Sequence, residues 1–150
     1  MNTNNAGIAL IKKYEGLRLN SYLCPRGIPT IGFGHTGPDV HLGQTINERE
    51  AEQFLKGDLL QFEHGVEEYL DGVPASFNEF SAMVCLAYNI GLGRFRTSSV
   101  LKYHRQGKKL LAANAFLPWI FVNKKKTLGL VRRRTAEGAL CFLSLIQKNT

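Results

Sequence analysis

The spacing of apolar side chains changes along the chain, and the first segment has the spacing of a helix. Ile8, Ile11, Lys12 and Tyr14 predict a short N-terminal helix. Polar residues 3–5 precede it and are available as its cap. The helix ends where glutamate and glycine follow Tyr14.

A β-prone segment comes next. The runs LRLNSYL (residues 17–23) and IPTIGFGH (residues 28–35) are separated by Pro25-Arg26-Gly27, which is typical of a turn. They predict a pair of antiparallel strands. Gly32 and Gly34 alternate with larger side chains in the second run, a spacing that suits close approach by another backbone or a ligand.

Helical spacing returns at Asn47 and continues to the C-terminus. Asn47 with Glu50, and Ser76 with Glu79, form capping-box patterns at the start of two helices. The glycines of NIGLGRF end the second of these helices. Three further helices are predicted over 98–106, 108–117 and 132–147. The fold class is therefore α+β, with a small N-terminal sheet followed by a mostly helical body, in one domain over 1–150.

The net charge of the chain indicates which classes of molecule it binds. Against 12 acidic residues the chain has 19 lysines and arginines, a formal charge of +7, which favours nucleic acid, an acidic membrane face or an acidic polymer. An apolar share of 44% is typical of soluble globular proteins. We find no membrane-spanning run and no secretory signal, so we expect a chain made in the cytosol.

The cysteines and histidines give no metal-ligand spacing, and we expect neither a metal nor a cofactor. Three widely spaced cysteines form neither a zinc pattern nor a disulfide framework. Cys85 and Cys141 lie in apolar runs and are expected to be buried. His41, His64 and His104 are expected at the surface, a list that leaves only His35 near the candidate chemistry.

Glu15 is the first candidate for chemistry, because it lies at the junction of the helix and the first strand. Partial shielding beside Tyr14 and Leu17 would raise its pKa and keep it protonated near neutral pH. The alternative is a solvated glutamate at a helix C-terminus, where the helix dipole disfavours its charge.

The segment EGLRLNSYLCPRGIPTIGFGHT resembles the phage-type lysozyme (endolysin) family, glycoside hydrolase family 24. The family signature is Glu, eight residues, Asp or Cys, five residues, then Thr, and Glu15, Cys24 and Thr30 fit it. AYNIGLGRFRTSSVL and GLVRRRTAEGAL resemble two later blocks of the family, in order. The resemblance implies a lysozyme-like fold.

The resemblance also implies a reaction. Glu15 would be the general acid that protonates the glycosidic oxygen between N-acetylmuramic acid and N-acetylglucosamine in peptidoglycan. Thr30 would hold the attacking water on the opposite sugar face. Residue 24 would activate this water or stabilise the cationic sugar, as a second carboxylate usually does, in an inverting reaction.

Cys24 stands where aspartate is commoner in the family. A thiol titrates near about 8.5 and is mostly uncharged at neutral pH, unless Lys12, Arg18 or Arg26 lowers its pKa. Three interpretations stay open: a working base or nucleophile, a redox gate, or an impaired site.

Substrate-binding candidates follow from the same resemblance, each with a structural alternative. His35 is a candidate proton carrier or binding group, but an ion-pairing role is favoured. Tyr88 and Asn89 suit an N-acetyl sugar, or else helix packing and capping. Ser98 is a weaker candidate, being also a plausible N-cap. Arg133 represents the arginines at 132–134, of which at least one is expected to bind substrate.

The resemblance thus implies a lysis enzyme that is stored in the host cytoplasm and acts on the wall after membrane permeabilisation, with peptidoglycan as its expected partner. We expect a monomer, no nucleic-acid partner, and contact of the remaining basic residues, including lysines 124–126, with anionic wall polymers or membrane. The alternatives are a lytic transglycosylase and a weakly catalytic, cationic wall-binding or membrane-disrupting protein.

Overall fold

Residues 1–147 are described by a computed structural model, in which the chain divides into two units. We name residues 11–61 the β unit, and residues 1–10 with 62–147 the helical unit. The expectation of one catalytic domain over 1–150 stays a prediction beside this division.

Two helices contribute residues to both units, and both begin at predicted caps. Helix α1 (Asn5–Glu15) follows Asn4, whose Oδ1 accepts a backbone N–H at 3.0 Å. Helix α2 (Glu48–Leu70) follows Asn47, whose Oδ1 accepts the Glu50 N–H at 2.8 Å. The Asn47 N–H donates to the Glu50 carboxylate at 3.3 Å, which completes the predicted capping box.

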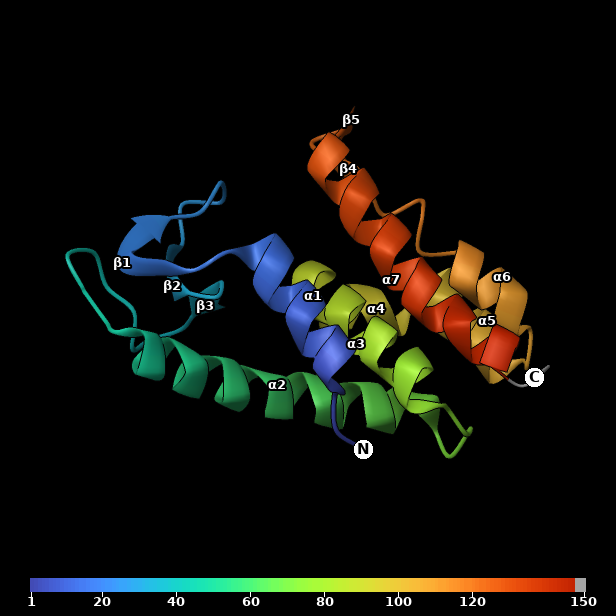
Figure 1. Cartoon of the computed structure of the whole chain (residues 1–150). Helices are drawn as coiled ribbons and strands as arrows, with labels where there is room; N and C mark the ends of the chain where they lie inside the picture. Colours follow the sequence, from blue (N-terminus) through green and yellow to red (C-terminus); the bar gives the residue numbers. More distant parts are fainter. Residues whose placement is uncertain (148–150) are drawn as a thin grey trace. The chain divides into compact units, whose positions relative to one another are not determined.

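The β unit contains an antiparallel sheet in the order β1-β2-β3 (Figure 1). Its strands are β1 (Arg18–Leu23), β2 (Pro29–Gly32) and β3 (His35–Thr36). The predicted turn is closed by the Gly27 N–H, which donates to the Cys24 carbonyl at 2.8 Å. The predicted second strand is interrupted, because Gly32 (φ 67°) and Gly34 (φ 76°) turn the chain into β3.

His35 joins β3 to α2 within the β unit. Its Nδ1 lies 2.8 Å from Asp58 Oδ2, its Nε2 lies 3.1 Å from Asp39 Oδ1, and its ring stacks on Phe54 at 4.3 Å. Burial lowers the His35 pKa, but the hydrogen bonds and charges of Asp58 and Asp39 outweigh it, so the pKa is raised. The protonated ring therefore stabilises this unit.

The helical unit is built around α3, which packs against α7, while α6 packs against α5 and α7 (Figure 1). The predicted apolar stripe of α3 is buried from Phe80 to Ala87. The elements of this unit beyond α2 are α3 (Phe77–Ile90), α4 (Leu92–Arg96), α5 (Ser99–Arg105), α6 (Lys109–Asn114), β4 (Phe121–Val122), β5 (Lys125–Lys126) and α7 (Leu128–Gln147).

Three elements of this unit differ from the prediction. Helix α4 was not predicted, because five residues are too few to show a period. The β4–β5 hairpin was not predicted either, since its turn uses Asn123 (φ 50°) and Lys124 (φ 66°) instead of glycine. Helix α7 begins at Leu128, ahead of the arginines that were expected to open it.

The expectation that His104 lies at the surface is wrong. His104 is 1% exposed, and its Nε2 lies 3.0 Å from the Pro74 carbonyl, to which it donates. It shares the buried face of α5 with Val100 and Leu101, at helical spacing. Cys85 and Cys141 are buried as predicted, and burial raises the pKa of Cys141 to about 12.

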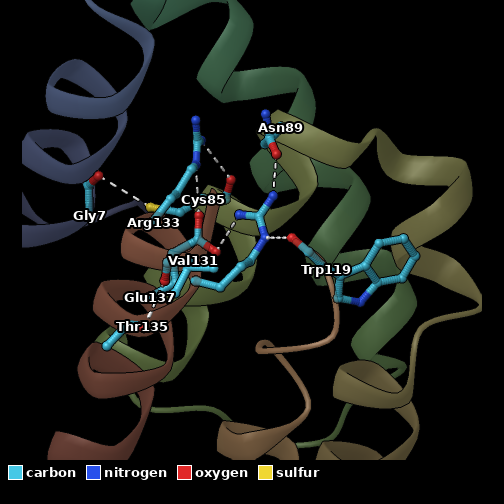
Figure 2. A network of polar contacts seen from close by, with 9 residues as sticks. Gly7, Cys85, Asn89, Trp119, Val131, Arg133, Thr135 and Glu137 are labelled. Atoms are coloured by element: carbon cyan, nitrogen blue, oxygen red, sulfur yellow. Dashed lines mark hydrogen bonds and ion pairs between the residues drawn. The ribbon is translucent and has the colours of Figure 1, made fainter. Parts of the chain in front are cut away.

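A buried ionic network ties α7 to α3 (Figure 2). The Glu137 carboxylate is fully buried and lies 3.0 Å from Arg133 Nε and 2.7 Å from Arg134 Nη1. Arg133 also donates to the Cys85 carbonyl at 3.2 Å, and Arg134 donates to the Trp119 carbonyl at 2.8 Å. Each charge therefore has an opposite partner, which buried charges require.

We predict that Glu137→Gln lowers the free energy of unfolding by about 3–5 kcal/mol, because it removes the buried negative charge that faces both guanidinium groups. Urea unfolding followed by circular dichroism measures this change. The control is Glu67→Gln, at an exposed carboxylate 3.0 Å from the N-terminal amine, which should change stability by about 0.5 kcal/mol or less. Equal losses in the two variants would contradict the role of the network.

The His35 ion pairs predict a pH dependence of stability. Because its folded pKa is raised, the contribution is full below the unfolded value of about 6.5 and is lost as pH rises through the folded value. Asp58→Asn should therefore cost about 1–3 kcal/mol near pH 5 and less near pH 9. Unfolding free energies at both pH values measure this, and a loss that grows with pH would refute it.

Candidate active site

Glu15 occupies a position that its neighbours keep free of side chains. It is the last residue of α1, and Gly16 (φ 73°) then turns the chain toward β1. A Cβ built on Gly34 would lie 2.5 Å from Glu15 Oε2. Gly34 also has a positive φ, which L side chains rarely adopt, and the Glu15 carboxylate would have to shift to admit a side chain there. The sequence predicted close approach by another backbone or a ligand at this glycine, whereas its neighbour is the Glu15 side chain.

Thr30 lies on β2, where the register places it opposite Tyr22 on β1 and Thr36 on β3. Residues directly opposite in antiparallel strands share a face of the sheet. Thr30 is 3% exposed, and its Oγ1 donates to the Ile28 carbonyl at 2.9 Å. Because this bond uses the hydroxyl proton, the oxygen lone pairs are directed to accept hydrogen bonds.

Cys24 follows β1 at the start of the turn. Its backbone N–H donates to the Ile28 carbonyl at 3.0 Å. Hydrogen bonds from the backbone at Ile28 and Arg26 lower the pKa of the thiol, with a smaller contribution from the Arg26 charge, and outweigh partial desolvation. Arg26 is one of the three cations that were expected to act in this way. Cys24 is a free thiol.

Tyr22 is a neighbour of the site that the sequence did not single out. Burial raises its pKa, and the negative charge of Glu15 acts in the same direction, while Arg18 opposes it. The Arg18 guanidinium lies 4.4 Å from the centroid of the Tyr22 ring. The available signal was its position two residues before Cys24, which places both on one face of an extended strand. Glu15, Cys24, Thr30 and Tyr22 thus belong to one polar cluster of the β unit.

The substrate-binding candidates are distributed over both units. His35 in the β unit makes the ion pairs that its structural alternative predicted. In the helical unit, the Tyr88 ring lies 5.1 Å from Phe62, and Asn89 is exposed while its Oδ1 accepts from Arg134. Both residues of α3 therefore have packing or hydrogen-bonding partners, and their binding roles stay predictions.

Ser98 and Arg133 are buried in the helical unit. Ser98 is 4% exposed and is the N-cap of α5, where its Oγ accepts the Leu101 N–H at 3.3 Å. Arg133 is 3% exposed and belongs to the network around Glu137 (Figure 2). Their structural roles are thereby established, and contact with substrate stays a prediction for both.

Neither a metal cluster nor a spanning helix is found within residues 1–147. No group of three or more His, Cys, Asp or Glu side chains in this range could hold a metal ion. No helix there combines the length and apolarity needed to cross a membrane.

Known proteins match this chain over most of its length. The phage lysozyme family matches residues 12–137. The endolysin of Bacillus phage B103 is 43% identical over 99% of this chain and 57% of its own length, so the chain spans little more than half of that relative. The endolysin of Salmonella phage P22 is 40% identical over 96% of this chain and 99% of its own.

A solved structure agrees with this assignment. The endolysin from Escherichia coli O157:H7 phage FAHEc1 superposes with a TM-score of 0.86 at 36% identity, covering 96% of this chain and 95% of the other. The predicted α+β, lysozyme-like fold is confirmed. The match of the family over residues 12–137, with Glu15, Cys24 and Thr30 inside it, leads to one conclusion: this chain belongs to the phage lysozyme family.

Proposed function

We propose that this chain is an endolysin, a muramidase that hydrolyses the β-1,4 bond between N-acetylmuramic acid and N-acetylglucosamine in peptidoglycan. The observation that carries this proposal is the polar cluster of Glu15, Cys24 and Thr30 in the β unit, in a member of the phage lysozyme family. The cluster combines an acid, a hydroxyl acceptor and an activated thiol, which are the groups needed to cut a glycosidic bond with water.

Glu15 serves as the general acid that protonates the departing glycosidic oxygen. A proton donor must approach this oxygen within hydrogen-bond distance. The glycine at position 34 favours that approach, since a side chain there would overlap the Glu15 carboxylate. Tyr22, with its raised pKa, stays a neutral neighbour and adds no second negative charge beside the acid.

In this proposal, Thr30 orients the attacking water and Cys24 deprotonates it. Thr30 donates its hydroxyl proton to the Ile28 carbonyl, so its lone pairs accept a hydrogen bond from the water and orient it. The thiolate of Cys24 then takes up a proton as the water attacks the anomeric carbon, giving an inverted product. The lowered thiol pKa supports this interpretation of Cys24 over an impaired site.

We propose substrate-binding roles for residues of each unit, taken separately. Tyr88 and Asn89 on α3 offer an aromatic face and an exposed amide to an N-acetyl sugar. His35, Ser98 and Arg133 support binding from positions fixed by their own partners. The protein acts as a monomer on the cell wall, which it reaches from the host cytoplasm after the membrane is permeabilised.

We predict that Glu15→Gln lowers the rate of purified-peptidoglycan digestion by about 10²–10⁴-fold, the contribution of a general acid. Mass spectrometry of the released muropeptides measures both rate and product. Glu48→Gln, which removes the same charge from an exposed position on α2, is the matched control and should digest at the wild-type rate. Full-speed cutting by the folded Glu15→Gln protein would refute the proposal, and products lighter by one water would show a transglycosylase instead.

If Cys24 is the base, its pKa determines how enzymatic activity depends on pH. A base acts when deprotonated, so activity should rise with pH through a thiol pKa lowered below its ordinary value of about 8.5. Cys24→Asp should move this rising limb toward about pH 4, the ordinary value of aspartate. Rates measured from pH 4 to 9, with Cys24→Ser as the non-ionising control, test this. An unchanged limb in both variants would exclude Cys24 as the base, and a retained anomer by NMR would make it a nucleophile.

A further inference from the structure

We infer that a surface hollow between α4 and α5 binds the phosphodiester groups of an anionic wall polymer. The hollow has a volume of about 490 Å³ and lies wholly within the helical unit. Arg96, Lys102 and Arg105 line it, together with the polar side chains of Thr97, Ser98 and Gln106. The identity of the polymer as a wall component rests on the proposed function, whereas the phosphate chemistry of the site does not.

The first observation is the charge of this hollow. Three cationic side chains face one cavity that no acidic residue lines. Lys102 and Arg105 are three residues apart on α5, so they are neighbours on one helix face, where like charges repel. Bringing Arg96 to the same cavity adds to this repulsion. An anion bound between the three would remove it, which is the condition for an oxyanion site.

An adjoining hollow shows that the basic cluster is local. It has a volume of about 360 Å³ and shares Arg96 and Arg105 with the first, but it is also lined by Glu68 and Asp71. Arg105 Nη2 lies 3.5 Å from Asp71 Oδ2, a long and exposed contact that contributes little. The two acids line the second hollow only, whereas the first hollow is lined by three cations and by no acid.

The restrained position of the Arg96 guanidinium also favours a phosphate ligand. The Arg96 guanidinium lies 5.6 Å from the centroid of the Tyr69 ring, a cation–π contact that restrains it. A restrained, planar guanidinium binds two oxygens of a phosphate at once and loses little side-chain entropy in doing so. Lys102 supplies a point charge beside it.

The lining favours a soluble polymer chain over a membrane. A surface that binds lipid needs exposed apolar side chains beside its basic residues. Leu101 is the apolar residue of this hollow, and it is 2% exposed. A phosphodiester chain needs only the cations and the polar side chains, which this hollow provides.

The test is binding of an oligomer of glycerol phosphate to the full chain carrying Glu15→Gln, so that catalysis does not interfere. The variant Arg96→Gln/Lys102→Gln/Arg105→Gln removes the three cations of the hollow. The control Lys124→Gln/Lys125→Gln/Lys126→Gln removes three cations from the β4–β5 hairpin and its turn, and thereby lowers net charge equally. Calorimetry measures affinity, and amide NMR shifts locate the bound oligomer.

We expect the hollow variant to lose about tenfold or more in affinity, about 1.4 kcal/mol, while the lysine control, whose cations attract anionic polymers through general charge only, loses much less. Shifts should fall in residues 96–106. Equal losses in both variants would show general charge attraction and overturn the proposal, as would no binding by the parent chain. Tighter binding to vesicles of anionic phospholipid would show that the hollow binds a membrane instead of a phosphodiester polymer. Tighter binding to polyglutamate would show that it binds a carboxylate polymer instead. Inorganic phosphate alone distinguishes a single-ion site from a polymer site.

These outcomes are separate from those of the proposed function. Digestion of peptidoglycan stripped of phosphodiester polymers tests Glu15 without involving the hollow. Oligomer binding by the inactive chain tests the hollow without involving Glu15. The hollow variant should digest stripped walls at the parent rate, so a failure of either proposal is recognised independently.

Discussion

The contact between the Glu15 carboxylate and the backbone of Gly34 is the constraint on which the β unit depends. Both residues terminate local structure: Glu15 ends α1, and Gly34 lies in the turn that leads from β2 to β3. The carboxylate needs a neighbour without a Cβ, and the turn needs a residue that tolerates a positive φ. Gly34 meets both requirements. A substitution there would therefore disturb both the turn and the space occupied by the Glu15 carboxylate.

The two units stabilise charged groups by different means. In the helical unit, the guanidinium groups around Glu137 are buried and matched by hydrogen-bonded partners, which fixes α7 against α3. In the β unit, Cys24 is placed at a turn, where backbone hydrogen bonds favour its charged form. The first arrangement stabilises packing between elements that are distant in the chain, and the second lowers the pKa of a thiol through its neighbours in one turn.

Prediction from the sequence succeeded where the determinants are local. The caps at Asn47 and Ser76 were recognised because a capping box is complete within four residues. The Pro25–Gly27 turn was recognised for the same reason. His104 was assigned to the surface because its burial depends on helices distant in sequence. The β4–β5 hairpin escaped prediction because only the folded chain shows non-glycine residues at positive φ.

The sequence by itself determined which residues are proposed to carry the chemistry, since the spacing of Glu15, Cys24 and Thr30 is a property of the chain alone. It also determined the fold class, through periodicity and caps. Only the tertiary structure decided that Thr30 is buried and donates to a carbonyl, that Tyr22 borders the acid, and that Arg133 is matched with Glu137. These features depend on solvent exclusion and on atoms meeting across elements, which the order of residues does not specify.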